Sequence, residues 1–397
     1  MSSAKINANG NAPAPVPDPS GDPSGAGTSR SRAVQAGAGF FGKASAAGTN
    51  FLQWYGVPRL IITCFLLALL ILAVIYKMDI GSLLGDSLKR IGMNGLLVLA
   101  MVPTITCGAG LNFGLPVGII CGLVGGVFSM SMNLTGFTGF FVAILLALPL
   151  SVIAGWLYGK LLEKVAGQEM MVGTYVGFSV VAGMAIFWLT APIKNPSMIF
   201  AIGGQGLRYT LTLYDYYAGV LNNFLSFNIV IGNFAMTIPT GLLLFFGLFC
   251  VLMYLFFRSR TGLAMLAVGS NPQYAASSGI NIRKMRYTGV IMSTVLGAIG
   301  ILVYAQSYGF LQLYNAPLYM AFPAIAAILI GGATLRKATI SQVIIGSILF
   351  FTLLTTALPV VQTVLDGSEV GGSISEIARM IIQNGTILYA LTRVGRR

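Results

Sequence analysis

The sequence contains no histidine and very few charged residues of any kind. Of its 397 residues, 8% are Asp, Glu, Lys or Arg and 56% are hydrophobic, whereas an ordinary soluble domain carries about 25% charged residues. The absence of histidine removes the commonest metal ligand and general base. The shortage of charge excludes a large soluble domain, because a surface in contact with water needs charged side chains.

Cysteine is also scarce, and its four copies stand apart in apolar stretches without CxxC spacing: Cys64, Cys107, Cys121 and Cys250. This distribution predicts small buried side chains, and neither a disulfide framework nor a metal site. No set of nucleophile, base and metal ligands comes together in the sequence, so we do not expect an enzyme.

Long stretches without charge take the place of a charged surface. None of residues 91–159, 170–193, 216–257, 287–335 and 338–365 is charged, and a helix that crosses a bilayer needs about 20 mostly apolar residues. The sequence therefore predicts an all-α, polytopic membrane protein with about ten transmembrane helices. We place them near 60–78, 91–108, 114–133, 138–159, 171–191, 233–257, 287–307, 321–335, 339–358 and 376–392.

The positions of Lys and Arg predict the orientation, because these residues are retained on the cytoplasmic side. With ten crossings both termini lie on one side, and placing them in the cytoplasm puts most of the 23 Lys and Arg residues there. The exceptions are Lys77, Lys89, Arg90, Lys194, Arg208 and Arg379. The net charge of +13 is then explained by topology and by anionic lipid, without a nucleic-acid partner. We expect a multi-pass protein of the cell (inner) membrane.

Glycine is abundant, with 50 copies. In residues 114–126 small residues stand three to four apart, a spacing that lets helices approach closely in lipid. The alternative, which the sequence leaves open for residues 107–118, is a helix broken inside the membrane around a pathway.

The first 50 residues are rich in Ala, Pro, Gly and Ser and have almost no large apolar groups, so we expect a disordered cytoplasmic tail. Within it Gly37, Gly42 and Lys43 match part of a phosphate-binding loop. Ala44 stands where Ser or Thr must bind magnesium, so the match is a coincidence and the chain has no ATPase of its own. Residues 51–397 form the transmembrane domain, with a cytoplasmic loop at about 258–286. On the outer side, residues 207–224 are expected to form a surface helix.

The stretch AVGSNPQYAASSGINIRKMRY, residues 267–287, is polar and basic between two apolar runs. Asn271 suits an N-cap, Pro272 suits the first helical position, and Gly279 can end the helix with a positive φ. The sequence predicts a two-turn cytoplasmic helix with a small-residue face. Two interpretations stay open, namely a loop helix anchored by Arg and Lys at the lipid headgroups and a rigid projection that fits a groove of a cytoplasmic partner.

This stretch resembles the coupling-helix region of permeases from ATP-binding-cassette importers. The branch is the one for ribose, galactose and other simple sugars, with branched-chain amino acid and nucleoside permeases as relatives. Residues 258–262 match the start of the family pattern loosely, and the rest is carried by Gly269, Asn271, Pro272, Ala275, Ala276, Gly279 and Ile280, with Ala267. Residues 321–335 resemble a second block of the family pattern, and residues 107–118 resemble a third. In the third block Asn112 and Phe113 stand in place of the usual acidic residue and the residue that follows it.

The resemblance implies a permease subunit that works with other chains: a second permease subunit in a homodimer or heterodimer, a cytoplasmic ATPase that binds ATP and Mg, and an outer solute-binding protein. This chain would need no cofactor or metal of its own. A neutral polar solute is expected, because the spans carry no charge to pair with an ion. Our first expectation is a monosaccharide, followed by a nucleoside and a branched-chain amino acid. The rival of another class is an ion-coupled secondary transporter.

Polar residues at membrane depth are the candidates for lining the pathway: Asn94, Thr104, Thr106, Asn112 and Gln306. Each could instead form a hydrogen bond between helices, and the sequence does not decide between the two roles.

Overall fold

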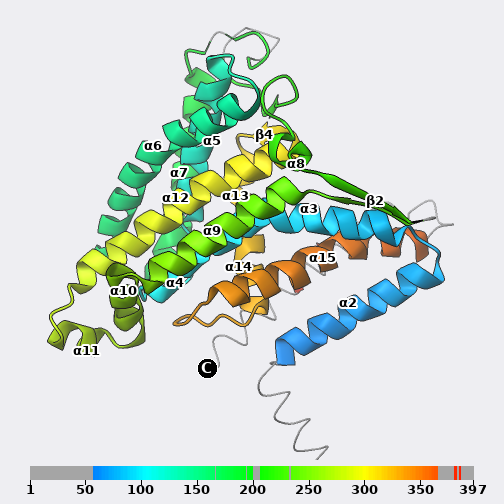
Figure 1. Ribbon diagram of the computed structural model, residues 1–397. Helices are drawn as coiled ribbons and strands as arrows, with labels where there is room; N and C mark the ends of the chain where they lie inside the picture. Colours follow the sequence, from blue (N-terminus) through cyan, green and yellow to red (C-terminus); the bar gives the residue numbers. More distant parts are fainter. Residues whose placement is uncertain are drawn as a thin grey trace, which may run out of the picture. The chain divides into compact units, whose positions relative to one another are not determined.

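The computed structural model describes residues 57–165, 167–193, 195–199, 206–231, 234–364, 380–381 and 384–385. Within these residues the chain consists of helices with two short antiparallel strand pairs (Figure 1). The predicted tail at 1–50 and most of the predicted last span at 376–392 lie outside the described residues.

The helices, in chain order, are α2 (Val57–Ile75), α3 (Ile80–Leu99), α4 (Met101–Thr106), α5 (Leu115–Ser131), α6 (Gly136–Lys164), α7 (Glu169–Thr190), α8 (Val220–Asn223), α9 (Thr240–Arg258), α10 (Arg260–Ser270), α11 (Pro272–Ser277), α12 (Ile282–Tyr308), α13 (Asn315–Tyr319), α14 (Ala321–Ile330) and α15 (Ile340–Val364). The strands are β1 (Thr210–Thr212), β2 (Phe227–Ile231), β3 (Phe234–Ile238) and β4 (Phe310–Gln312).

The first nine predicted spans each overlap an apolar helix. Six helical segments are long and apolar enough to cross a membrane, namely Ile80–Thr106, Gly136–Lys164, Glu169–Thr190, Thr240–Arg258, Ile282–Tyr308 and Ile340–Thr363. Three others are shorter, namely Arg59–Ile75, Leu115–Ser131 and Asn315–Ile330. The described residues confirm a multi-pass helical membrane protein, whereas the number of ten crossings is not confirmed.

Two of the spans form the buried centre of the bundle. In the most apolar window of α3–α4, 83% of the residues are buried, and in that of α12 the share is 78%. α12 packs against α3, α4, α5 and α6, and α3 also packs against α15. By contrast, only 17% of the corresponding window of α7 is buried, and apolar side chains such as Ile186 are exposed there. α7 is therefore a peripheral helix with an apolar outer face.

Small residues bring α5 against α12, as the glycine spacing predicts. A Cβ added at Gly118 would lie 2.4 Å from the carbonyl oxygen of Thr294, and one added at Gly122 would lie 2.4 Å from that of Ala298. Neither position has room for a larger side chain, so these glycines set the distance between the two helices.

The loops gather at two ends of the bundle. At one end, which we call the α11 end, the α4–α5 loop, the α6–α7 corner, the α10–α11 corner and the α14–α15 loop line a common cavity. At the other, the β end, β1 pairs with β4 and β2 pairs with β3. Figure 1 shows α10 and α11 far from α8 and β4. This arrangement agrees with spans that cross in alternating directions.

The surface helix predicted at 207–224 is wrong for most of its length. Residues Thr210–Thr212 form β1, because the loop after α12 offers Phe310–Gln312 as a pairing strand. Only Val220–Asn223 is helical, preceded by Gly219 at φ 68°. Long-range strand pairing overrides the local sequence here.

Candidate functional site: a junction at the α11 end

The backbone of α11 follows the local sequence signals closely. The side chain of Asn271 caps the helix by accepting a hydrogen bond from the Tyr274 amide at 3.1 Å, and Pro272 occupies the first helical position. Gly279 lies just beyond the helix at φ 76°, a conformation that favours glycine. The predicted two-turn helix, with its start and its stop, is confirmed.

The two alanines of the predicted small-residue face point to opposite sides. Ala275 is fully buried, in a cluster with Cys107, Met265, Val268 and Met285. Ala276 is exposed, as are its neighbours Gln273, Tyr274 and Ser277. Ala275 therefore holds α11 on the bundle, and the surface that α11 offers to a partner is formed by Gln273, Tyr274, Ala276 and Ser277. We call this surface the outer face of α11.

We call the buried contacts that hold α11 on the bundle the seat of α11. The seat depends on close backbone contact between α10 and α4. A Cβ added at Gly269 would lie 2.1 Å from the carbonyl oxygen of Thr106. Ile280 is partly buried and packs against the same cluster as Ala275. Of the residues predicted to couple the chain to an ATPase, Gly269, Ala275 and Ile280 thus fix the position of α11, whereas Ala276 lies on its outer face.

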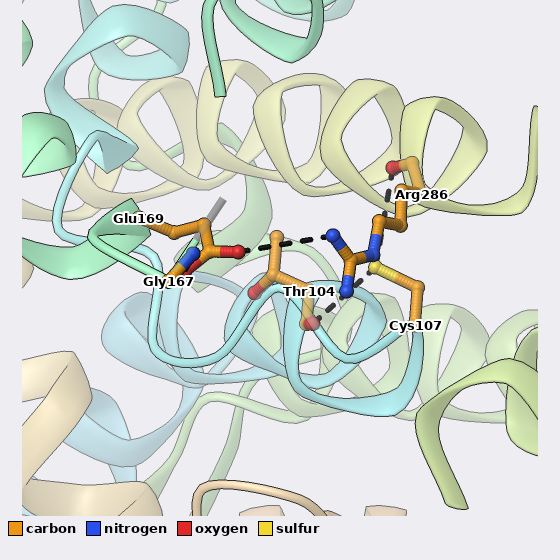
Figure 2. A network of polar contacts seen from close by, with 5 residues as sticks. All are labelled: Thr104, Cys107, Gly167, Glu169 and Arg286. Atoms are coloured by element: carbon orange, nitrogen blue, oxygen red, sulfur yellow. Dashed lines mark hydrogen bonds and ion pairs between the residues drawn. The ribbon is translucent and has the colours of Figure 1, made fainter. Parts of the chain in front are cut away.

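Cys107 joins the end of α4 to α12 (Figure 2). Its Sγ donates to the carbonyl of Thr104 at 3.3 Å and to that of Arg286 at 3.9 Å. Burial raises the pKa of the Cys107 thiol to about 11, so the thiol stays protonated at neutral pH and remains a donor. Its residue type is therefore used for packing and weak hydrogen bonding, as the spacing of the cysteines predicts.

Asn112 is the centre of a buried polar network that spans four elements. Its Nδ2 donates to Ser293 Oγ at 2.8 Å, and its Oδ1 accepts from the Tyr158 hydroxyl at 3.2 Å. Ser293 Oγ in turn donates to the carbonyl of Ala100 at 2.6 Å. The network ties the α4–α5 loop to the junction of α3 and α4, to α6 and to α12. Residues 107–114 do interrupt the helices, with Gly108 and Gly110 at positive φ.

The other candidate pathway residues are buried and hydrogen-bonded to backbone groups. Asn94 donates to the Arg90 carbonyl at 3.0 Å, and Thr104 and Thr106 donate to carbonyls of their own helix. Gln306 donates to the Val303 carbonyl at 3.2 Å and accepts from the Leu221 amide at 3.2 Å. These contacts stabilise helices and bring α8 onto α12, while a role in the pathway stays a prediction.

Ion pairs connect the first turns of α12 to the α6–α7 corner, and sequence reasoning missed them. Arg283 pairs with Glu163 at the end of α6, and the Tyr287 hydroxyl also donates to Glu163. Arg286 Nη1 lies 3.8 Å from Glu169 Oε1 at the start of α7. The sequence signal was the spacing of Arg283 and Arg286, which places both on one helix face, opposite two acids that flank a glycine-containing corner.

A cavity of about 740 Å³ opens beside this junction. Its wall includes Gly108, Glu169, Gly269 and Arg336, one from each of the four loops that meet at the α11 end. Among the residues that the structure describes, no group of three or more Cys, Asp or Glu is placed to bind a metal ion. The junction thus combines a short projecting helix, a buried polar network, ion pairs and an open cavity.

A comparison of the sequence with known protein families shows to which family the chain belongs. Residues 83–391 match the family described as branched-chain amino acid transport system / permease component. The chain belongs to this permease family. The permease is accordingly a transport subunit and not an enzyme, and the family predicted from the coupling-helix stretch is confirmed.

Two curated relatives share part of the sequence. The permease is 31% identical over 138 residues to the nucleoside ABC transporter permease protein NupC of Lactococcus lactis subsp. cremoris (strain MG1363), covering 35% of this chain and 39% of the relative. It is 35% identical over 78 residues to the guanosine ABC transporter permease protein NupQ of Bacillus subtilis (strain 168), covering 20% of this chain and 24% of the relative. The matched stretches thus span less than half of either relative. No solved structure matches the permease.

Positive charge is concentrated at the α11 end of the permease. The described cations of this end are Arg59, Lys160, Lys164, Arg258, Arg260, Arg283, Lys284, Arg286, Arg336 and Lys337. Toward the β end the described cations are Lys77, Lys89, Arg90 and Arg208, accompanied by Asp79, Asp86 and Asp215. Lys160 also places its Nζ 3.4 Å from the Trp156 ring centroid, a cation–aromatic contact.

Proposed function

We propose that this chain is the membrane-spanning permease subunit of an ATP-driven importer of nucleosides. The names of the relatives support a nucleoside over the monosaccharide that the sequence favoured, and the interior of the bundle supports a neutral polar solute of either class. Both relatives described above are named as nucleoside or guanosine permeases. The buried polar side chains of the bundle, such as Asn112, Ser293 and Gln306, are also uncharged, which suits a neutral polar solute.

In this proposal α11 is the helix on which a separate ATPase subunit docks. The observation that carries it is the division of α11 into two faces, with Ala275 fully buried in its seat and Tyr274 67% exposed. A short helix held on one side by tight packing and bare on the other transmits force as a rigid body. An anchoring helix would need no such seat, because basic side chains alone hold a loop at the headgroups.

The other partners follow from the family. A second permease subunit, identical or related, would complete the pathway, and an outer solute-binding protein would deliver the nucleoside at the β end. ATP and Mg would bind to the ATPase chain. The accumulation of Lys and Arg at the α11 end supports placing that end in the cytoplasm, with residues 192–232 outside.

The test is uptake of radiolabelled guanosine into proteoliposomes that contain the permease with its ATPase and its binding protein. We expect uptake to require ATP, to be competed by unlabelled nucleosides, and to be insensitive to ribose and leucine. Competition by ribose or leucine in place of nucleosides would reassign the substrate. Uptake that persists without ATP and stops when the sodium or proton gradient is removed would show an ion-coupled transporter instead.

A further inference from the structure

Glu169 and Arg286 lie close together but too far apart for a charge-assisted hydrogen bond. Its N–O distance is 3.8 Å, whereas a charge-assisted hydrogen bond is about 2.7–2.9 Å long. Arg286 Nε is buried and has no hydrogen-bond partner among the described residues. The ion pair beside it, Arg283 with Glu163, is in close contact. The Glu169–Arg286 pair, which we call the inner pair, is therefore loose, whereas the Glu163–Arg283 pair is in direct contact.

The space around the inner pair allows it to tighten. A small cavity of about 20 Å³ lies between Glu163, Glu169, Arg283 and Arg286, which is enough for one water molecule. A relative shift of roughly 1 Å between α7 and α12 would bring Glu169 within hydrogen-bond distance of Arg286. Figure 2 shows the Arg286 guanidinium directed toward Glu169, with Cys107 beside it and linked to the backbone carbonyls of Thr104 and Arg286.

The two elements joined by this contact differ in burial. Arg286 stands on α12, which is largely buried and shares the seat of α11 through Met285. Glu169 is the first residue of α7, whose most apolar window is 17% buried. Gly167, at φ 92° in the α6–α7 corner, donates its amide to Glu169 at 2.9 Å. A movement of α11 with the start of α12 therefore reaches the first turn of α7.

We propose that Glu169 and Arg286 form a movable ionic contact that transmits displacement of the α11–α12 unit to α7. The contact is loose in the present arrangement and tightens when a docked ATPase pushes on α11. Both are positioning residues, which touch neither solute nor nucleotide. This inference rests on the proposed function, because it presupposes an ATPase that docks on α11.

The experiment uses the complex of the permease with its ATPase and binding protein in proteoliposomes, with guanosine as the probe. It measures the ATPase bound per permease, the basal hydrolysis rate, and the ratio of ATP hydrolysed to guanosine imported. The variants are Glu169→Gln, Arg286→Gln, the conservative Arg286→Lys and the charge swap Glu169→Arg with Arg286→Glu. Arg260→Gln, an exposed cation at the same end, is the matched control.

We expect Glu169→Gln and Arg286→Gln to bind the ATPase as the unchanged protein does, to hydrolyse ATP, and to raise the ATP-to-guanosine ratio at least tenfold. Arg286→Lys and the charge swap should recover at least part of the coupling, which a merely structural role would not predict. Arg260→Gln should leave the ratio unchanged.

The outcomes separate this inference from the function on which it rests. If the unchanged permease binds no ATPase, or hydrolysis is not needed for uptake, the proposed function fails and the inference fails with it. If docking and ATP-driven uptake are intact and both neutral variants keep the normal ratio, only the ionic contact is refuted. If the neutral variants fail to assemble, the charge swap decides: coupled transport by the assembled swap supports the contact, and uncoupled transport by it refutes the contact.

Discussion

Enlarging either of the two neighbouring alanines of α11 is predicted to have a different effect. Ala276 lies on the outer face and Ala275 is fully buried in the seat. Ala276→Arg should leave the fold intact, because an Arg at this exposed position stays solvated. When the ATPase docks, the same Arg becomes a bulky unpaired charge at the interface.

The size of the effect follows from the cost of burying a charge. An unpaired charge removed from water costs several kcal/mol, and even about 3 kcal/mol corresponds to a roughly 100-fold weaker complex. Ala275→Leu acts differently, since three added carbons enter a site with no free space, and overpacking costs about 1–3 kcal/mol of folding stability. We therefore expect lost docking for Ala276→Arg and a lowered unfolding temperature for Ala275→Leu.

The assay combines binding of the purified ATPase to the permease in nanodiscs with thermal unfolding of each variant. Thr261→Arg is the matched control, because Thr261 is exposed at the same end on α10 and lies off the outer face of α11. It should change neither quantity. Normal ATPase binding by Ala276→Arg would mean that α11 is only an anchor, and the docking assignment would be refuted.

The remaining predictions concern packing, chemistry and orientation. Gly122→Leu should lower the unfolding temperature strongly, because it overpacks α5 against α12 at a cost of about 1–3 kcal/mol of folding stability. Gly247→Leu should be tolerated, because a Cβ at Gly247 meets nothing within 4 Å. Equal losses of stability in the two variants would contradict the tight crossing of α5 and α12. In a variant with Cys64, Cys121 and Cys250 replaced by Ala, Cys107 should resist maleimide at pH 7.4 and react faster as the pH rises toward its pKa of about 11, because the thiolate is the nucleophile. With Cys107 replaced as well, a cysteine introduced at exposed Ser278 should react at once. An impermeant reagent added outside intact cells should label a cysteine at Asn223 and not one at Ser278, and the reverse result would invert the topology.

The amino-acid sequence by itself determined the membrane class, the positions of most spans and the form of α11. These are local properties, because each depends on the composition of one segment or on a few neighbouring residues. Asn271, Pro272 and Gly279 specify the start and stop of α11 without reference to the rest of the chain, and the charge-free runs specify the apolar helices in the same way. The family could also be predicted from this segment.

Only the tertiary structure decided which side chains meet. Ala275 and Ala276 are adjacent and chemically identical in the sequence, and the packing of α11 against its neighbours, which include α10 and α12, turns one inward. The pairing of β1 with β4 depends on residues about 100 positions apart, which is why the local pattern at 207–224 misled. Glu169 and Arg286 are likewise ordinary loop-flanking charges until α6, α7 and α12 pack together. Such contacts depend on distances between segments far apart in the sequence, and no local pattern of residues fixes those distances.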